Sequence, residues 1–150
     1  MLEYNLRPFT PRQKKNVIDF LTELSVKTRK LLSVSGIDPE SIYMSFREDW
    51  ERTWPICLYR GEKLVGIGKL SPHGQDGVYL SCLVIADKEH HKGLGSRIIK
   101  YLIAIGMLNG ATSVTLEARK ENKKAQLCFN RNGFKYTSEQ EETFTMVRRL

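Results

Sequence analysis

Residues 80–96, LSCLVIADKEHHKGLGS, decide the fold of this chain. The segment begins with an apolar run, passes through a polar turn, and ends with two glycines that open a new apolar-periodic stretch. This order predicts a strand, a glycine-rich loop and a helix. Glycines let the backbone approach a ligand closely, and the first amides of a helix have no acceptor within it. Because those amides also lie at the positive end of the helix dipole, the segment predicts a phosphate or pyrophosphate site.

The glycine spacing excludes two familiar phosphate loops. A Walker loop requires GxxxxGK[ST], which is absent, and a dinucleotide fingerprint requires a third glycine where Ile98 stands. The residues His90-His91-Lys92-Gly93-Leu94-Gly95 resemble instead the Arg/Gln-x-x-Gly-x-Gly/Ala loop of the GNAT acetyltransferases. In that family the loop holds the pyrophosphate of coenzyme A.

A second stretch, residues 122–134, strengthens the resemblance. It is similar to the GNAT motif Asn-x-x-Ala-x-x-Leu/Phe-Tyr-x-x-x-Gly-Phe, with matches at Asn122, Ala125, Gly133 and Phe134. Two motifs in the expected order and at the expected separation identify the chain as a member of the GNAT superfamily. In motif it is closest to the ribosomal-protein alanine N-acetyltransferases.

Composition is typical of a soluble globular protein, and the length predicts one domain, residues 1–150. Hydrophobic residues make up 41% of the chain and charged residues 27%, and no linker or repeat divides it. Residues 1–10 carry charges and lack an apolar core, so they do not read as a secretory signal. The uncharged stretch 101–116 is interrupted by glycine and polar residues, which argues against a membrane span.

The cysteines and the charged residues indicate where the protein is located and which ligands it binds. Cys57, Cys82 and Cys128 are odd in number and widely spaced, which predicts a reducing, cytoplasmic location and no structural zinc. The adjacent His90 and His91 lack a second ligand pair, so we expect no metal. The net charge is +7, but the basic residues are dispersed. They favour a polyphosphate cofactor over nucleic acid, which we do not expect as a partner.

The periodicity outlines the scaffold. Apolar spacing predicts a helix from Pro11 to about Val34 with a break near Ser25, and Asp38 is an expected N-cap for a helix over 39–50. Further helices are expected at 94–108 and 123–132, and strands at 3–7, 56–60, 64–70, 78–85, 114–118, 136–139 and 143–149, with 71–77 as a loop. Strands that flank and alternate with helices imply an α/β (α+β) fold with a mixed sheet.

The resemblance adds detail to this fold. It implies a mostly antiparallel sheet of six to seven strands, splayed at its centre and flanked by about four helices. It also implies that the strand before the loop pairs through its backbone with the pantetheine arm of acetyl-CoA. The cofactor contacts that it assigns are Leu83, Val84, Ile85, His90, His91, Lys92, Gly93, Leu94, Gly95, Ser96, Asn122, Ala125 and Phe129.

An amine attacks a thioester only after losing its proton, so acyl transfer requires a base. Glu117 lies in Leu116-Glu117-Ala118-Arg119, which resembles the LEVR segment whose glutamate is the base in the ribosomal-protein alanine N-acetyltransferases. Strand alternation turns Glu117 away from the core side of its neighbours. Asp87, His73 or a water relay with Glu48 are the alternatives.

Two positions depart from the family pattern. Phe129 stands where many members have the tyrosine that protonates the leaving thiolate, and phenylalanine has no proton to donate. Tyr79, Tyr136 or water could replace it, or the thiolate could leave unprotonated. His90 replaces Arg/Gln in the loop; its backbone amide could serve equally, while its side-chain charge would depend on pH near neutrality.

Together these features predict an acetyl-CoA-dependent N-acetyltransferase that moves acetyl to a primary amine in a ternary complex. The alternative is a CoA-binding sensor without turnover, which Phe129 favours. The acceptor is expected to be set by residues 11–50 and 136–149, where Tyr43, Phe46, Trp50 and Trp54 could line a pocket or fill the core. The last strand could pair across a homodimer.

Overall fold

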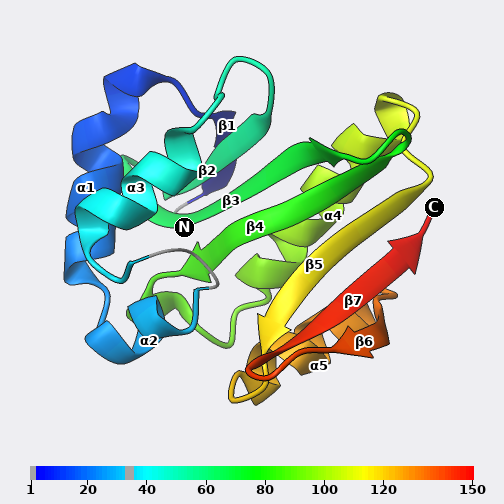
Figure 1. Cartoon of the computed structure of the whole chain (residues 1–150). Coiled ribbons are helices and arrows are strands. Elements are labelled where there is room, and N and C mark those ends of the chain that lie inside the picture. The colour runs from blue at the N-terminus through cyan, green and yellow to red at the C-terminus, as the bar shows by residue number, and fades with distance from the viewer. Residues whose placement is uncertain (1–2, 33–35) are drawn as a thin grey trace.

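A seven-stranded sheet runs through the computed structural model, which describes residues 3–32 and 36–150. The strand order is β1-β2-β3-β4-β5-β7-β6, and only β4 and β5 pair in parallel (Figure 1). The predicted mixed, mostly antiparallel sheet is therefore confirmed. The strands are β1 (Tyr4–Pro8), β2 (Trp54–Arg60), β3 (Lys63–His73), β4 (Gly77–Ile85), β5 (Ser113–Arg119), β6 (Lys135–Glu139) and β7 (Thr143–Arg149).

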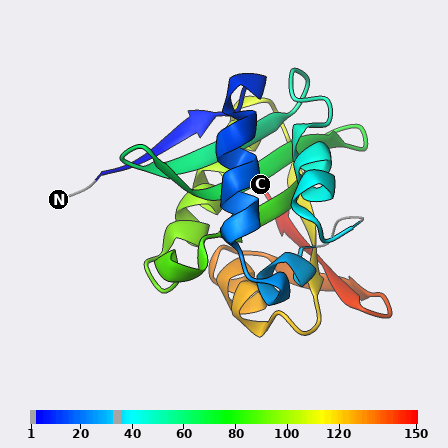
Figure 2. The same ribbon diagram turned by 90° about the vertical axis from the view of Figure 1, so that its left-hand side faces the viewer.

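Helices cover the two faces of the sheet unequally. α3 and α4 lie on opposite sides of the strands (Figure 2), and the smaller core beneath α1 and α3 takes its strand residues from β2, β3 and the last part of β4. The front of β5, β7 and the first part of β4 carries no helix in Figure 1. The helices are α1 (Lys14–Glu23), α2 (Val26–Lys30), α3 (Pro39–Arg47), α4 (Leu94–Leu108) and α5 (Lys123–Arg131), with short 3₁₀ turns at Pro11–Gln13 and Asp87–Glu89.

The first helical region breaks where the sequence predicts. The Ser25 hydroxyl accepts a hydrogen bond from the Thr28 amide at 3.1 Å, which caps α2 and separates it from α1. α2 ends at Lys30, and the expected end at Val34 lies outside the described residues. Asp38 caps α3 as expected, but α3 ends at Arg47 instead of Trp50.

The prediction of a loop over 71–77 is wrong, because β3 continues to His73 and only residues 74–76 form the turn. Pro72 stands within this extension and pairs with Val78. β2 pairs with β3 only as far as Leu70, so this end of β3 has a free edge on that side. A proline on such an edge removes no ladder hydrogen bond, which is why the strand tolerates it.

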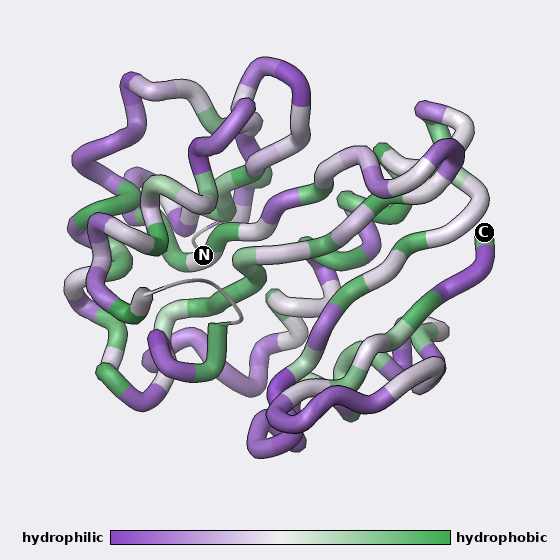
Figure 3. Tube along the Cα trace, in the orientation of Figure 1, coloured by the Kyte–Doolittle hydropathy of each residue, from purple (hydrophilic) through white to green (hydrophobic). Residues whose placement is uncertain are grey.

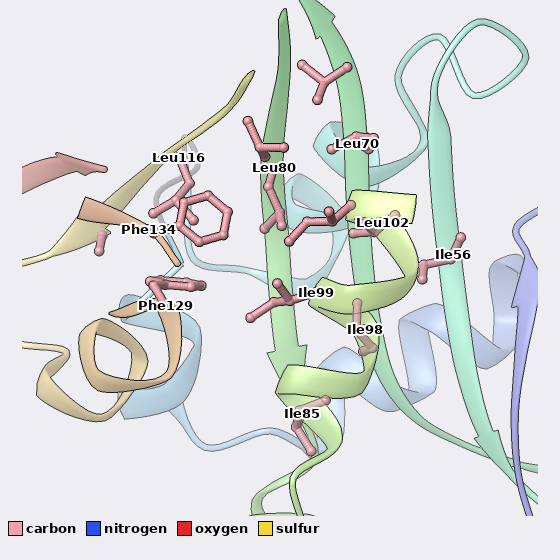
Figure 4. Close-up of a cluster of buried hydrophobic side chains, with 14 of the residues drawn as sticks. Ile56, Leu70, Leu80, Ile85, Ile98, Ile99, Leu102, Leu116, Phe129 and Phe134 are labelled. Atoms are coloured by element: carbon pink, nitrogen blue, oxygen red, sulfur yellow. The ribbon is translucent and has the colours of Figure 1, made fainter. Parts of the chain in front are cut away.

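Two apolar cores lie on the two sides of the sheet. The larger lies against α4 and α5, where Leu80, Leu102 and Leu116 are each no more than 3% exposed (Figure 4). α4 lies so close to β3 that a Cβ on Gly68 would stand 2.7 Å from a methyl carbon of Ile98. The smaller core joins α1 and α3 to the sheet, and the hydrophilic residues gather in the connecting loops (Figure 3).

The predicted splay lies between β4 and β5. The two strands pair only from Gly77 to Tyr79 and from Ser113 to Thr115, although β4 continues to Ile85 and β5 to Arg119. Beyond these pairs, the backbone N–H and C=O groups with which β4 and β5 face each other form no hydrogen bonds between the two strands.

In the part of β4 that does not pair with β5, the strand also carries a bulge. It has one more residue than β3 between the pairs Lys69↔Ser81 and Ile67↔Val84, and Cys82 has a left-handed φ of 55°. The extra residue shifts the side-chain alternation. Ile85 therefore joins Leu80 in the larger core, while Cys82 lies in the smaller core.

Candidate active site

The glycine-rich loop turns sharply before α4. His91 and Gly93 both have left-handed backbones, with φ of 68° and 74°, and the strain at His91 is of a kind often found at binding sites. The first backbone bond of α4 runs from the Arg97 amide to the Gly93 carbonyl at 3.2 Å. Leu94, Gly95 and Ser96 therefore precede the first helical donor.

The amides of this loop have no protein acceptor. Within residues 3–32 and 36–150, no backbone N–H from His91 to Ser96 donates a hydrogen bond to another protein group. They stand at the N-terminus of a fifteen-residue helix. Free donors at the positive end of a helix dipole form a surface suited to an anion.

The side chains of the loop are held by the protein instead. The His90 ring nitrogen Nε2 lies 3.0 Å from the Ile85 carbonyl oxygen. The Lys92 ammonium is bonded to the Glu89 carboxylate, so its charge already has a partner. The loop residues that the sequence singled out therefore present backbone more than side chain.

Glu89, which sequence reasoning missed, is the buried anchor of the loop. Its side chain is 4% exposed, and its carboxylate lies 2.9 Å from Arg60 Nε and 3.3 Å from the Tyr4 hydroxyl. The hydrogen bond from Lys92 holds the pKa of Glu89 below its ordinary value, against the opposing effect of burial, and the charge of Arg60 adds to the lowering. No pattern marks this residue, because a glutamate in a polar turn reads as solvated.

The remaining predicted cofactor residues lie on either side of the splay. Val84 and Ile85 are buried and pair with β3 on one edge only, and Leu83 is half-buried. Asn122 is the N-cap of α5, and its side-chain oxygen Oδ1 accepts a hydrogen bond from the Ala125 backbone amide at 3.3 Å. The side-chain NH₂ group of Asn122 is therefore free to donate.

Another residue that the sequence did not single out, Asn132, joins α5 to the start of α4. Its side chain is almost wholly buried and donates to the Ser96 hydroxyl at 3.0 Å and to the Cys128 carbonyl at 2.8 Å. The Cys128 thiol lies 3.4 Å from the same hydroxyl. The two predicted motifs are thus brought together, and this contact sets the position of α5 beside the loop.

Glu117 lies on the other face of the sheet. It is exposed, while Leu116 and Ala118 on either side of it are buried, as the alternation predicts. It stands two residues beyond Thr115, the last residue of β5 that pairs with β4. Among the described residues no cation forms an ion pair with Glu117. A carboxylate beside an open splay is free to accept a proton.

The alternative bases occupy different surroundings. Burial alone would raise the pKa of Asp87, but hydrogen bonds from Thr28 and Ser25 outweigh it and lower the pKa, and they hold the carboxylate against α2. The His73 ring packs against Tyr79 with 5.4 Å between ring centroids, on the same uncovered face as Glu117. The Glu48 side chain is exposed at the end of α3.

Lys69 is the buried charge of this face. Lys69 is 5% exposed, and its ammonium donates to the Ser45 carbonyl at 2.9 Å and the Glu48 carbonyl at 2.7 Å. Burial lowers the pKa of Lys69, while the negative charges around it oppose that change. The bonds fix the C-terminal end of α3 over β3.

The aromatic residues that could have lined an acceptor pocket divide into two groups. Tyr43 and Phe46 are 2% and 0% exposed and belong to the smaller core. Trp50 is half-buried at the edge of the smaller core, and Trp54 is half-buried at the edge of the larger one. The core interpretation therefore holds for the first pair.

Within residues 3–32 and 36–150, no set of three or more His, Cys, Asp or Glu side chains is arranged to hold a metal ion. None of the helices in this part of the chain combines the length and apolarity needed to cross a membrane.

Comparison with known proteins gives the class. The family model described as "Acetyltransferase (GNAT) family" matches residues 20–134. The chain therefore belongs to the GNAT family of acetyltransferases, which are acyltransferases, and the resemblance of the two motifs is confirmed.

Individual relatives agree with this membership. The chain is 31% identical over 121 residues to an uncharacterized N-acetyltransferase, YobR, of Bacillus subtilis (strain 168), covering 77% of this chain but only 47% of the relative. The PaiA N-acetyltransferase of Thermoplasma acidophilum in complex with coenzyme A superposes with a TM-score of 0.81 at 17% identity, covering 99% of both chains. The ribosomal-protein-S18-alanine N-acetyltransferase of Escherichia coli gives 0.78 at 13% identity, covering 98% of this chain and 94% of that one. At such identities the superpositions show the shared fold.

Proposed function

We propose that this protein transfers an acetyl group from acetyl-CoA to a primary amine by direct attack in a ternary complex. The observation that carries the proposal is the row of unpaired amides from His91 to Ser96, placed beside the splay of β4 and β5. A pyrophosphate group has the charge and the acceptors that these donors lack. The coenzyme A bound to the Thermoplasma relative is of this chemical kind.

The cofactor would then lie across three elements. The amides from His91 to Ser96 bind its pyrophosphate. The backbone of Leu83, Val84 and Ile85 pairs with the pantetheine arm, since it has no partner on the β5 side. Asn122, Ala125 and Phe129 of α5 approach the arm from the other side.

Glu117 acts as the base in this proposal. It accepts a proton from the attacking amine, whose nitrogen forms the amide bond with the acetyl carbonyl carbon. The tetrahedral intermediate then collapses, the carbon–sulfur bond breaks, and coenzyme A leaves with the electron pair on sulfur. Nothing in the proposal requires an acyl-enzyme.

The alternative function is a coenzyme A sensor without turnover. Phe129 favours it, because the phenol of the usual acid is missing at that position. Other features remain part of the proposal as expectations: a cytoplasmic location, one domain over 1–150, a homodimer and no nucleic-acid partner.

Calorimetry and thiol release separate these functions. Isothermal titration should show saturable binding of acetyl-CoA, and thiol release should follow when spermidine, an aminoglycoside or a peptide with a free N-terminus is added. Glu117→Gln should lower kcat by about 10²-fold or more while leaving the affinity for acetyl-CoA unchanged. Glu62→Gln, another exposed glutamate, lies outside the segments expected to set the acceptor; it is the matched control and should keep full activity.

Each negative result has a definite meaning. Binding without turnover on any amine would support the sensor. An absence of heat with acetyl-CoA would overturn both readings. Affinity for nucleic acid that falls steeply with salt, and that ignores coenzyme A, would point to a basic nucleic-acid-binding domain.

A further inference from the structure

The leaving thiolate needs a proton that the α5 position cannot give. Phe129 is 7% exposed and packs edge-on against Phe134, with 5.9 Å between ring centroids (Figure 4). A phenylalanine ring has no acidic proton. If the proposed transfer operates, another group must protonate the sulfur or the thiolate must leave as an anion.

Tyr79 stands at the start of the splay. It pairs with Thr115 in the last rung that joins β4 to β5, so the strands separate immediately beyond it. Side chains of paired residues share a face, and residues two apart along a strand share it too. Tyr79 and Glu117 therefore lie on the same face of the sheet, one at each side of the opening.

The surroundings of Tyr79 restrain its ring. The side chain is half-buried, and the His73 ring packs against it with an interplanar angle of 44°. Burial is the main reason that the pKa of Tyr79 is raised to about 12, and the negative charge of Glu117 adds to the effect. The backbone of Glu117 acts in the opposite direction and lowers the pKa in part. The phenol thus stays protonated at neutral pH and adjoins the proposed base.

Other candidates for the acid are occupied or misplaced. The Tyr136 hydroxyl donates to Gln126 at 3.0 Å, and Tyr136 packs on Phe144, which shares the α5 side of the sheet with Ala118. The Cys128 thiol lies against the Ser96 hydroxyl. Neither group shares a face with Glu117.

We propose that Tyr79 protonates the leaving thiolate and regains its proton from Glu117. The amine gives its proton to the Glu117 carboxylate as the carbon–nitrogen bond forms. When the carbon–sulfur bond breaks, the Tyr79 hydroxyl proton moves to sulfur, and the proton on Glu117 moves to the phenolate oxygen. The products are the amide and coenzyme A as a free thiol, and both side chains return to their starting states.

The return of the proton makes this step favourable. A phenol is a weaker acid than a thiol, so Tyr79 alone would transfer its proton to sulfur uphill. A carboxylic acid is a much stronger acid than a thiol. The relay through Tyr79 thus moves a proton from carboxylic acid to thiolate, which is downhill overall.

The test uses hydroxylamine as the acceptor, because it is uncharged near neutral pH and needs no specific recognition. Thiol release from acetyl-CoA is measured for the wild type, Tyr79→Phe and the control Tyr101→Phe, which removes another half-buried phenol. We expect Tyr79→Phe to lower kcat by about 10²-fold, with the affinity for coenzyme A kept, and Tyr101→Phe to remain near wild type. Unchanged kcat in Tyr79→Phe overturns the proposal, whereas a wild type without turnover contradicts the proposed function instead.

Fluorination gives a second measurement that does not remove the hydroxyl. A polyfluorinated tyrosine at position 79 has a much more acidic phenol, so the alkaline limb that this phenol sets should move from near pH 12 down toward neutral pH. Profiles of Glu117→Gln and His73→Gln identify the limbs of the two titrating groups that face Tyr79, and Lys69→Met and Cys82→Ala do so for the buried groups nearby. An alkaline limb that stays in place sinks the relay, even where Tyr79→Phe fails to fold.

Discussion

The two faces of the sheet differ in what covers them. On the α4 side the strands present an apolar surface that is buried along its length, with Leu80, Leu116 and Ile98 in contact. On the other side α1 and α3 cover β2, β3 and the last part of β4, while the part of β4 and β5 that holds Tyr79, Thr115 and Glu117 has no helix in front of it (Figure 1). The residues of the first face are determined by the packing of the core, whereas the second face leaves polar side chains accessible to a substrate.

The sharpest test of this difference compares two neighbours on β5. Leu116 is 1% exposed in the larger core, so Leu116→Ala should lower the free energy of unfolding by about 2–5 kcal/mol. Glu117→Ala, one residue along, should change it by no more than about 0.5 kcal/mol, because the side chain is exposed. Urea denaturation measures both. Similar losses in the two variants would show that the open face is packed after all.

The next effect concerns the loop on the α4 side. Gly95→Asp places a carboxylate at the free amides, and we expect the affinity for coenzyme A to fall by about 10²-fold, which corresponds to about 2.7 kcal/mol. The helix should remain intact, because an acidic residue in the first turn interacts favourably with the dipole. Calorimetry and thermal melting report the two quantities separately.

Gly95→Ala is the control for that variant. Its Cβ would lie 3.8 Å from the Cys128 sulfur, an ordinary contact, so both stability and fold should be kept. Equal losses of affinity in the alanine and aspartate variants would mean that backbone freedom, and not charge, matters at this position.

A smaller effect is expected at the covered end of the open face. Lys69→Met removes the donor to the Ser45 and Glu48 carbonyls, and buried acceptors left unpaired cost about 1–3 kcal/mol. We expect a lower melting temperature and a raised KM for the amine, with the affinity for coenzyme A unchanged. A loss of coenzyme A affinity would instead connect Lys69 to the loop side.

The smallest effect is a pH dependence at Glu89. Its folded pKa lies below the ordinary value of 4.5, so its contribution to stability is present above that value and is lost as the pH falls through the folded pKa. The stability of the wild type should therefore fall toward that of Glu89→Gln in acid. Urea midpoints from neutral pH downward measure this. A difference that stays constant with pH would show that Glu89 contributes by shape alone.

The covered face was largely predictable, and the open face only in part. The helix 94–108 and the strand 143–149 have the predicted bounds, because their apolar spacing and caps agree with the packing. Residues 71–73 of β3 were predicted as a loop, because Pro72 and the glycines that follow are typical of loops. The strand tolerates Pro72 only because this end of β3 has a free edge, which the sequence does not reveal. Likewise Glu89, Asn132 and Lys69 are buried polar groups whose partners come from distant parts of the chain. Local patterns carry no signal for such pairings.

The bulge at Cys82 makes the length of β4 as important as its composition. From Leu80 to Ile85 the strand has to change phase once, so that aliphatic residues before and after the kink reach one layer of the molecule. A strand of the same length without the bulge would turn Ile85 toward the opposite layer, whereas a strand one residue shorter would reach the same layer by simple alternation. Grafts between relatives in this region must therefore transfer the bulge and the residue count together.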